Sequence, residues 1–264
     1  MDLDLTDKVA VVTGASKGIG LAVTRALVAE GARVIAGART ITDELVALSD
    51  SGHVMAVSVD LSTADGPAEL VARAEHFGGL DILVNNVGAV TPRTEGFLAV
   101  SDDDWLRTFN LTLMAGVRTT RAAIPLLLER GAGNVVTIAS VNAYLPDPGV
   151  IDYAAIKASV WNLSKSLSKE YGPRGLRFNT ISPGPVSTPL WLGETGVAAT
   201  IAAKLGVSLD EARERIVAEG GGFSTGRFTE PEEVADLVLL LASRRAGNVT
   251  GADFLIDGGL TKEL

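Results

Sequence analysis

The feature that most constrains the fold of this chain is an alternation of short apolar runs with longer segments of helical periodicity. Seven runs rich in β-branched residues are strand candidates, at residues 9–13, 33–37, 54–59, 80–84, 134–139, 177–181 and 253–256. The early runs are almost continuously apolar, as in parallel strands that are covered on both faces. Segments with apolar residues three and four apart lie between them. The sequence therefore predicts a doubly wound α/β fold with a parallel, seven-stranded sheet.

The domain organisation follows from what interrupts this alternation. No internal repeat, low-complexity segment or linker is visible, so residues 1–264 are expected to form a single domain. The stretch 185–228 opens with proline-rich turns, contains a predicted helix near 208–217 and closes with Gly220-Gly221-Gly222. Such an insert is typical of a helical lid over a substrate site, although a surface insertion is the alternative. After it, Thr229-Glu230-Pro231-Glu232 predicts a capping box that begins a helix ending near Ala242.

Composition excludes several function classes. Apolar residues make up 47% of the chain, which is ample for a buried core, and the net charge of −9 argues against a nucleic-acid binder. The absence of cysteine excludes disulfides and thiolate chemistry, and two distant histidines make a metal site unexpected. No stretch approaches the roughly 20 apolar residues of a membrane span, and no signal peptide is visible. A soluble, cytoplasmic protein without nucleic-acid or membrane partners is expected.

A glycine-rich turn follows the first predicted strand and opens the first predicted helix. It reads Thr13-Gly14-Ala15-Ser16-Lys17-Gly18-Ile19-Gly20. Glycines allow the backbone to approach a pyrophosphate, and a helix N-terminus offers free N–H groups with a partial positive charge. The turn therefore predicts nucleotide binding.

The end of the second predicted strand bears on which dinucleotide would bind. NAD sites usually carry an acidic residue about 20 positions beyond the glycines, where it accepts hydrogen bonds from the ribose. This chain has Gly37-Ala38-Arg39-Thr40 there, with no acid. Arg39 can pair with a 2′-phosphate through its planar fork, and Lys17 adds a second positive charge. NADP(H) is therefore favoured over NAD(H), unless both cations are ordinary surface residues.

A second group of residues suggests acid–base chemistry. Tyr153 and Lys157 are four positions apart on a predicted helix, so they share a face. A nearby ammonium favours the phenolate form of tyrosine, which allows proton exchange with a carbonyl or alcohol oxygen. Ser140 follows the fifth predicted strand, at the sheet edge where doubly wound folds bind ligands. A chance surface pair and a turn serine are the alternatives.

Together these elements resemble the short-chain dehydrogenase/reductase family, in its single-domain, Rossmann-like branch. The resemblance runs from Lys8 to about Gly259 and meets the family's motifs in order: Thr13-Gly14-x-x-x-Gly18-Ile19-Gly20, Asp60, Asn85-Asn86-x-Gly88, Asn110, Ser140, Tyr153-x-x-x-Lys157, Pro183-Gly184 and Asp257-Gly258-Gly259. Two positions depart from the pattern, since Val87 replaces the usual alanine and Ile156 replaces a small hydroxyl residue. Neither departure removes a reacting group.

The resemblance implies roles for these residues. Tyr153 would be the general acid/base, and Lys157 would lower its pKa and hold the nicotinamide ribose. Ser140 would orient the substrate carbonyl, and Asn110 would support a water-linked proton relay to Lys157. Asp60 and Leu61 would contact the adenine, and Thr188 the carboxamide. The complete implied cofactor-binding set is Gly14, Ser16, Lys17, Gly18, Ile19, Gly20, Arg39, Asp60, Leu61, Asn86, Gly88, Tyr153, Lys157, Pro183, Gly184, Val186 and Thr188.

The expected function is the NADP(H)-dependent interconversion of a ketone and a secondary alcohol. The predicted lid offers an apolar set that suggests a hydrophobic small-molecule substrate, unless it seals the lid onto its own core: Pro189, Leu190, Trp191, Leu192 and Val197. The alternative is a 3-oxoacyl-(acyl-carrier-protein) reductase, to which Arg130 and Arg174 would offer basic contacts. A non-catalytic nucleotide-binding regulator is a remote third reading. By resemblance, the chain would form a homotetramer or homodimer through the helices that bear Asn110 and Tyr153.

Overall fold

Seven parallel strands form one sheet in the computed structural model, which describes residues 2–194, 196–219 and 222–262. The strand order is β3-β2-β1-β4-β5-β6-β7, which confirms the doubly wound prediction. The strands are β1 (Val9–Thr13), β2 (Arg33–Ala38), β3 (Val54–Ser58), β4 (Ile82–Asn85), β5 (Gly133–Ile138), β6 (Leu176–Pro183) and β7 (Asp253–Ile256). The first and last predicted strands match to the residue, and the others shift by one or two positions at their ends.

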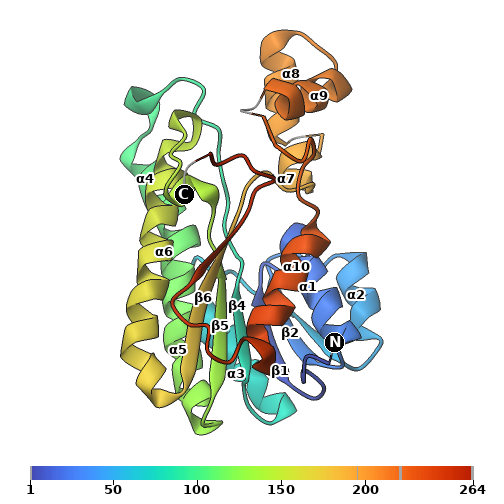
Figure 1. The fold of residues 1–264 in the computed structure, drawn as a ribbon, viewed down its shortest axis with the longest axis vertical. Coiled ribbons are helices and arrows are strands. Elements are labelled where there is room, and N and C mark those ends of the chain that lie inside the picture. The colour runs from blue at the N-terminus through green and yellow to red at the C-terminus, as the bar shows by residue number, and fades with distance from the viewer. Residues whose placement is uncertain (1, 195, 220–221, 263–264) are drawn as a thin grey trace.

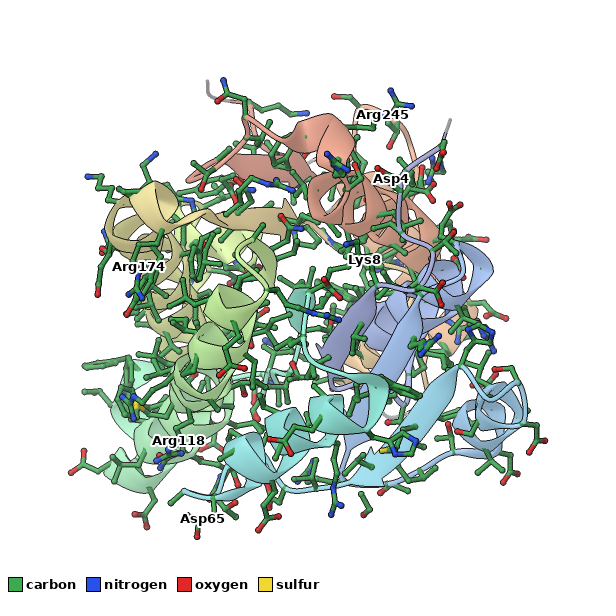
Figure 2. The ribbon with its side chains drawn as sticks, turned by 90° about the horizontal axis from the view of Figure 1, so that it is seen from below. Asp4, Lys8, Asp65, Arg118, Arg174 and Arg245 are labelled. Carbon is green, nitrogen blue, oxygen red and sulfur yellow. The ribbon has the colours of Figure 1, made fainter. Side chains whose placement is uncertain are left out.

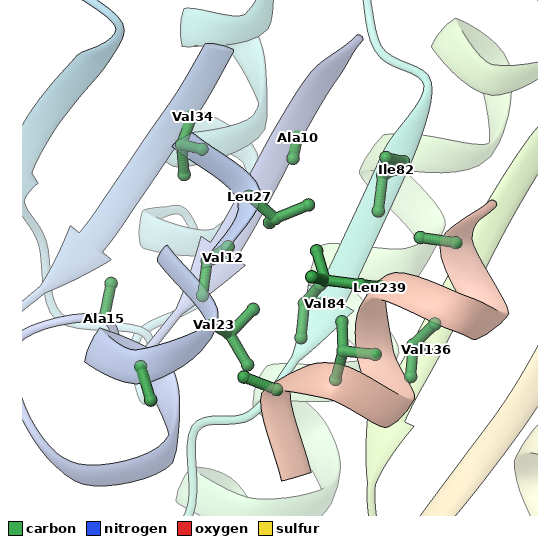
Figure 3. Packing of buried hydrophobic residues seen from close by; sticks show 14 of the residues in the cluster. Ala10, Val12, Ala15, Val23, Leu27, Val34, Ile82, Val84, Val136 and Leu239 are labelled. Atoms are coloured by element: carbon green, nitrogen blue, oxygen red, sulfur yellow. The ribbon is translucent and has the colours of Figure 1, made fainter. Parts of the chain in front are cut away.

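Helices cover both faces of the sheet, which is why the strands are apolar throughout. In β1, Ala10 and Val12 point into the core under one set of helices, while Val9 and Val11 point into the core under the other. The first set is α1 (Gly18–Ala29), α2 (Asp43–Ser49) and α10 (Pro231–Ala242). The second set is α3 (Gly66–Ala72), α5 (Ala115–Glu129) and α6 (Ile151–Tyr171). Figure 3 shows Val23 and Leu27 of α1 and Leu239 of α10 meeting the strand side chains.

One long helix runs from α4 (Asp102–Thr108) through a π-helical stretch (Phe109–Met114) into α5. Contrary to the sequence expectation, this helix, Asp102–Glu129, is long and apolar enough to span a membrane by length and composition alone. Its α5 part packs against α3, β4 and β5, which is the environment of a core helix of this fold. Because core helices pass the same length and composition test, this observation is weak evidence for a span.

Short helical turns complete the chain, at Arg73–Phe77, Phe97–Ala99, Val141–Ala143, Pro148–Val150, Gly172–Arg174 and Arg244–Ala246. The last of these holds the N-terminal segment, since Arg245 Nε donates to the Asp2 carbonyl at 2.9 Å. Figure 2 shows Asp4 and Arg245 close together at that corner, seen from below. This corner lies at the edge of the sheet where the strands begin.

The insert (residues 185–228) stands away from the sheet. It contains α7 (Pro189–Leu192), α8 (Val197–Leu205) and α9 (Leu209–Glu219), of which only α9 was predicted. Figure 1 shows α8 and α9 projecting from the body of the molecule. Gly220 and Gly221 of the predicted closing glycine run lie outside the described residues. The helix after the insert ends at Ala242 as predicted, but its capping box is formed by Glu230 and Glu233, one residue later than Thr229.

Candidate active site

A cavity of about 1500 Å³ opens where the strands end, between the sheet and the insert. The strand order reverses between β1 and β4, and such a switch point is where doubly wound sheets bind ligands. Among the residues proposed from the sequence for catalysis and cofactor binding, all line this cavity except Gly20 and Asn110. The fold therefore gathers residues that are spread over 175 positions from Gly14 to Thr188.

The glycine turn lies at the cavity wall, with Gly14 in the left-handed region at φ 67°. A Cβ on Gly20 would lie 2.2 Å from the Gly14 carbonyl oxygen, so Gly20 shapes the turn from behind rather than facing the cavity. Helix α1 has no acidic residue in its first turn and no side-chain cap on its first N–H groups. These uncapped donors suit the pyrophosphate of a dinucleotide.

Thr13 and Asn86 brace the turn against the end of β4. The Thr13 hydroxyl accepts from the Asn86 amide at 2.9 Å and from the Val87 amide at 3.0 Å. The Asn86 side-chain nitrogen donates to the Thr13 carbonyl at 2.9 Å and to the Gly14 carbonyl at 3.2 Å. Thr13 was included in the predicted glycine-turn motif but not among the proposed site residues, although a hydroxyl residue at the end of an apolar strand was the available signal.

The three charged residues proposed for the adenosine end lie together. Lys17 and Arg39 are exposed on the cavity wall, and neither forms an ion pair within the described part of the chain. Asp60 accepts from the Ser62 amide at 2.9 Å and from its hydroxyl at 2.7 Å. These bonds, and to a smaller extent Arg39, lower the pKa of Asp60. Two unpaired cations are thus available for a phosphate.

Ser140, Tyr153 and Lys157 line the cavity beyond the end of β5. Ser140 is buried and accepts from the Asn142 amide at 3.2 Å, while its hydroxyl donates to Asn142 Oδ1 at 3.3 Å. The buried Lys157 Nζ donates to the Ile138 carbonyl at 2.7 Å and lies 5.6 Å from the centre of the Tyr153 ring. A hydroxyl, a phenol and an ammonium therefore converge on one site.

Burial changes the acidity of two of these groups. It raises the pKa of Tyr153 to about 12, and a hydrogen bond with Ser140 acts in the opposite direction. It lowers the pKa of Lys157 to about 8. The pKa of Tyr153 is therefore raised, whereas the sequence analysis expected Lys157 to lower it. The physical reason is that loss of water disfavours the charged form of each group more than their mutual attraction favours it here.

Asn110 lies in the π-helical stretch and does not line the large cavity, whereas its neighbour Leu111 does. A second, small cavity of about 20 Å³ lies beneath Lys157 and is lined by Asn85 and Thr112. Asn85 Oδ1 and Thr112 Oγ1 are buried there without a hydrogen-bond partner among the described residues. This volume is sufficient for a single water molecule.

The insert supplies the other wall of the large cavity. Leu190, Trp191 and Val197 line it, whereas Leu192 does not. The Trp191 ring also packs against Phe228 at a centroid distance of 5.9 Å. Part of the apolar set therefore faces the cavity, as expected for substrate contact, and part of it packs within the insert, which was the alternative. At the base of the insert, a Cβ on Gly18 would lie 3.1 Å from the Thr188 methyl group. The insert therefore begins in contact with the glycine turn.

Arg130 and Arg174 lie away from this cavity. Each precedes the start of a strand, β5 or β6, and so lies at the opposite edge of the sheet. Figure 2 shows Arg174 on that underside, and Arg130 pairs with Asp81 at 3.4 Å. The expectation that these two arginines receive a carrier protein is therefore wrong, because the strands separate them from the site. Within residues 2–194, 196–219 and 222–262 there is also no group of three acidic or histidine side chains that could hold a metal ion.

Comparison with known proteins adds relatives of full length. Residues 14–261 match a family model described as enoyl-(acyl carrier protein) reductase. A 3-oxoacyl-[acyl-carrier-protein] reductase of Thermotoga maritima is 33% identical over 97% of this chain and 98% of its own. A D-β-hydroxybutyrate dehydrogenase of Rhizobium meliloti is also 33% identical, over 97% of this chain and 99% of its own. The structure of L-sorbose reductase from Gluconobacter frateurii, complexed with NADPH and L-sorbose, superposes with a TM-score of 0.91 at 34% identity, over the whole of both chains.

Proposed function

The chain belongs to the short-chain dehydrogenase/reductase family, and from this premise we propose that it interconverts a ketone and a secondary alcohol with NADP(H). One observation carries the proposal. Ser140, Tyr153 and Lys157 line the same cavity as the glycine turn, Lys17 and Arg39. A proton donor and a dinucleotide cradle thus share one cavity, as hydride transfer to a carbonyl requires.

The cofactor half of the cavity supports NADP(H) over NAD(H). The uncapped start of α1 would hold the pyrophosphate, and the exposed cations of Lys17 and Arg39 would pair with the 2′-phosphate. The sorbose reductase relative was solved with NADPH. The remaining proposed contacts are Ser16, Ile19, Asp60, Leu61, Asn86, Gly88, Pro183, Gly184, Val186 and Thr188, all on the cavity wall. When bound, the nicotinamide would supply or accept the hydride.

The chain's own residues would manage the proton. A phenol with a pKa of about 12 stays protonated near neutral pH, so Tyr153 holds the proton that a reduced carbonyl oxygen needs. The Ser140 hydroxyl would donate a hydrogen bond to the same oxygen as negative charge develops on it. Lys157, with a pKa of about 8, is charged at neutral pH and would favour the phenolate that remains.

Proton return to Tyr153 would pass through Lys157. The small cavity beneath Lys157, with the unpartnered oxygens of Asn85 and Thr112, supports a water there. Asn110 would support the same water-linked relay from two positions before Thr112 in the π-helical stretch. Because it does not line the large cavity, it is a positioning residue in this proposal rather than one that touches substrate.

The substrate half of the cavity favours an apolar carbonyl compound. Leu190, Trp191, Val197 and Ile201 of the insert line the cavity that Ser140 also lines. Apolar walls with a few polar groups at the reacting end are typical of small-molecule sites. The insert is accordingly proposed as a substrate lid.

A second candidate is reduction of a 3-oxoacyl group on a carrier protein. It is favoured by the relative from Thermotoga maritima and by two lid cations, Lys204 and Arg215, that line the cavity. If this candidate is right, Lys204→Ala with Arg215→Ala will lower activity on the carrier-bound thioester and leave activity on the same acyl group on a short thiol. Equal loss on both substrates argues against carrier docking at the lid. No observation favours a non-catalytic regulator.

Association into a homotetramer or homodimer belongs to the same proposal. On α6, Ala154, Ile156 and Val160 are buried within the monomer, while Trp161 is partly exposed. The long helix that bears Asn110 exposes Leu106 and Phe109 nearby in the sequence. Light scattering on the eluting protein measures the state directly, and a mass near the 27.4 kDa monomer contradicts it. Cytoplasmic location stays a prediction.

The test is NADPH consumption over cyclic ketones, diketones, 3-oxoacyl thioesters, sugars and steroids, with NADH in parallel. Tyr153→Phe removes the proposed proton donor and should lower kcat by about 10²- to 10⁴-fold while NADPH binding is retained. Tyr171→Phe, on the same helix but outside the cavity, is the matched control. Wild-type turnover by the Tyr153 variant, or no turnover of any carbonyl by the wild type, contradicts the proposal.

A further inference from the structure

A cluster of charges lies at the substrate wall of the cavity, apart from the reacting groups, and its central residue, Arg93, lines the cavity. Arg93 Nε donates to Asp152 Oδ1 at 3.1 Å, and Arg93 Nη2 donates to Asp152 Oδ2 at 2.6 Å. The third guanidinium nitrogen, Nη1, lies 3.2 Å from an oxygen of Asp104. Thr108 donates to Asp152 Oδ2 at 2.7 Å. One guanidinium therefore joins two carboxylates that come from different helices.

Arg93 and Asp152 are largely removed from water, whereas Asp104 is partly exposed. The side chains of Arg93 and Asp152 are 10% and 1% exposed. A buried charge is costly unless it is paired and fully hydrogen-bonded, and here both oxygens of Asp152 have donors. The hydrogen bond to Asp152 raises the pKa of Arg93, and bonds from Arg93 and Thr108 lower the pKa of Asp152 despite its burial. Both groups therefore stay charged.

The segments that the cluster joins are those that shape the substrate half of the site. Arg93 belongs to residues 89–96 and lines the cavity together with its neighbours Pro92 and Thr94. Its backbone amide also donates to the Gly149 carbonyl at 2.7 Å, just before α6. Asp152 lies in the first turn of α6 and directly precedes Tyr153.

We propose that Arg93 and Asp152 are positioning residues, which lock segment 89–96 onto the start of α6 and so set the substrate wall at a fixed place relative to the Tyr153 hydroxyl. The inference rests on the proposed function, since it deepens the description of the same site. A displacement of about 1 Å between a proton donor and the reacting group is enough to lower turnover about 100-fold.

The geometry requires arginine rather than a positive charge alone. The planar fork uses three nitrogens to hold two carboxylates from two directions. A lysine ammonium has the same charge but no fork, so it cannot keep both orientations. Arg93→Lys thus separates geometry from charge.

The first measurement is steady-state kinetics on Arg93→Lys. We expect kcat to fall about 10- to 100-fold while the NADPH dissociation constant stays within about twofold, because the cofactor half is not touched. Arg177→Lys is the matched control. Arg177 is also partly buried and donates to three backbone carbonyls, but it lies at the start of β6, at the far edge of the sheet. Its kcat should stay at the wild-type value.

A double variant separates positioning from stability. Arg93→Met with Asp152→Leu removes both charges, so the melting temperature should recover relative to Asp152→Leu alone, which leaves Arg93 with Asp104 as its only carboxylate partner in the cluster. If the pair positions the site, kcat of the double variant stays low. Recovery of kcat together with the melting temperature overturns the proposal, as does a wild-type kcat in Arg93→Lys.

A readout without turnover keeps the inference separable from the proposed function. In the holoprotein with NADPH, amide hydrogen exchange in residues 89–96 and 147–152 should speed up about tenfold in Arg93→Lys and stay unchanged in Arg177→Lys. If the wild type turns over no carbonyl but this exchange effect is seen, the proposed function fails, whereas the proposal that Arg93 and Asp152 hold segment 89–96 against α6 is supported. If the wild type turns over a carbonyl and amide exchange is unchanged in Arg93→Lys, the proposed function stands and the positioning role of Arg93 and Asp152 is contradicted.

Discussion

The two halves of the cavity are held in different ways. The cofactor half is built from strand ends, and hydrogen bonds that Asn86 and Val87 donate to Thr13 tie the end of β1 to the loop after β4. The substrate half is built from the insert, which enters and leaves the body at one place. There the Ser187 amide donates to the Thr229 carbonyl at 2.8 Å, and the Thr229 amide donates to the Pro185 carbonyl at 3.2 Å. Beyond that stem, α8 packs against α9 and α7 against α8.

This difference shows which half is able to change. Backbone N–H groups bind a phosphate only at a fixed distance, so the cofactor half tolerates little movement. The insert is joined to the sheet at a narrow base, so its side chains can be exchanged without disturbing the strands. The similar proteins named above have one fold and names that refer to different substrates. If the two halves are independent, a substitution in one half should leave binding in the other half unchanged.

The glycine turn should give the largest effect. Gly20→Ala places a Cβ 2.2 Å from the Gly14 carbonyl oxygen, so the turn must move. We expect NADPH affinity to fall about 100-fold by calorimetric titration. Gly14→Ala, where the nearest contact is an Asn86 side-chain atom at 3.0 Å, should cost less if Asn86 shifts. Gly116→Ala, with no atom within 4 Å, is the control, and equal affinity in all three variants contradicts a rigid cofactor half.

The adenosine end should discriminate between the two cofactors. Lys17→Ala with Arg39→Ala removes two cations proposed to pair with the 2′-phosphate. The NADPH dissociation constant should rise about 100-fold, because charge-assisted hydrogen bonds are lost, while that of NADH changes by less than about threefold. Arg25→Ala is the control, because Arg25 is an exposed arginine on α1 that does not line the cavity. Equal weakening of both cofactors rules out the 2′-phosphate assignment.

The lid should affect substrate without affecting cofactor. Trp191→Ala removes a large apolar side chain from the substrate wall. The KM of a bulky apolar ketone should rise about tenfold, while the KM of NADPH stays unchanged. A matching rise for both would show that the helical part of the insert beyond Thr188 also shapes the cofactor half, and the contrast between the two halves would be lost.

The smallest effect is expected at Lys157, where the two halves of the cavity meet. It concerns how the free energy of unfolding depends on pH. The pKa of Lys157 is lowered from 10.5 in the unfolded chain to about 8 in the fold. The unfolded state therefore binds more protons between these values, so the Lys157 contribution to stability is complete above 10.5 and is lost as pH falls through 8.

Lys157→Met lacks this dependence. The free energy of unfolding of the wild type relative to Lys157→Met should therefore rise by an amount on the order of 1–2 kcal/mol from pH 7 to pH 9.5. Denaturant titrations of both proteins at the two pH values measure this difference. Lys165→Met, an exposed lysine on the same helix, is the control. A constant difference between the wild type and Lys157→Met across this range contradicts a lowered Lys157 pKa.

Much of the architecture was predictable because it is written in local patterns. The apolar runs located every strand, since both faces of a parallel sheet are buried and each strand leaves the same signal. Tyr153 and Lys157 were found together because four residues make about one helical turn. The insert was recognised by its length, but α7 and α8 were not predicted, because short apolar helices have weak periodicity.

The strand count, the glycine turn and the pairing of Tyr153 with Lys157 could be predicted from the sequence, since each depends on neighbours along the chain. The contact between Arg93 and Asp152, 59 positions apart, is visible only in the folded chain. Folding also places Thr13 against Asn86, leaves Asn110 out of the lining of the large cavity, and puts Arg130 and Arg174 at the far edge of the sheet. Periodicity encodes which face of an element is buried, whereas contacts between distant side chains form only when the layers pack.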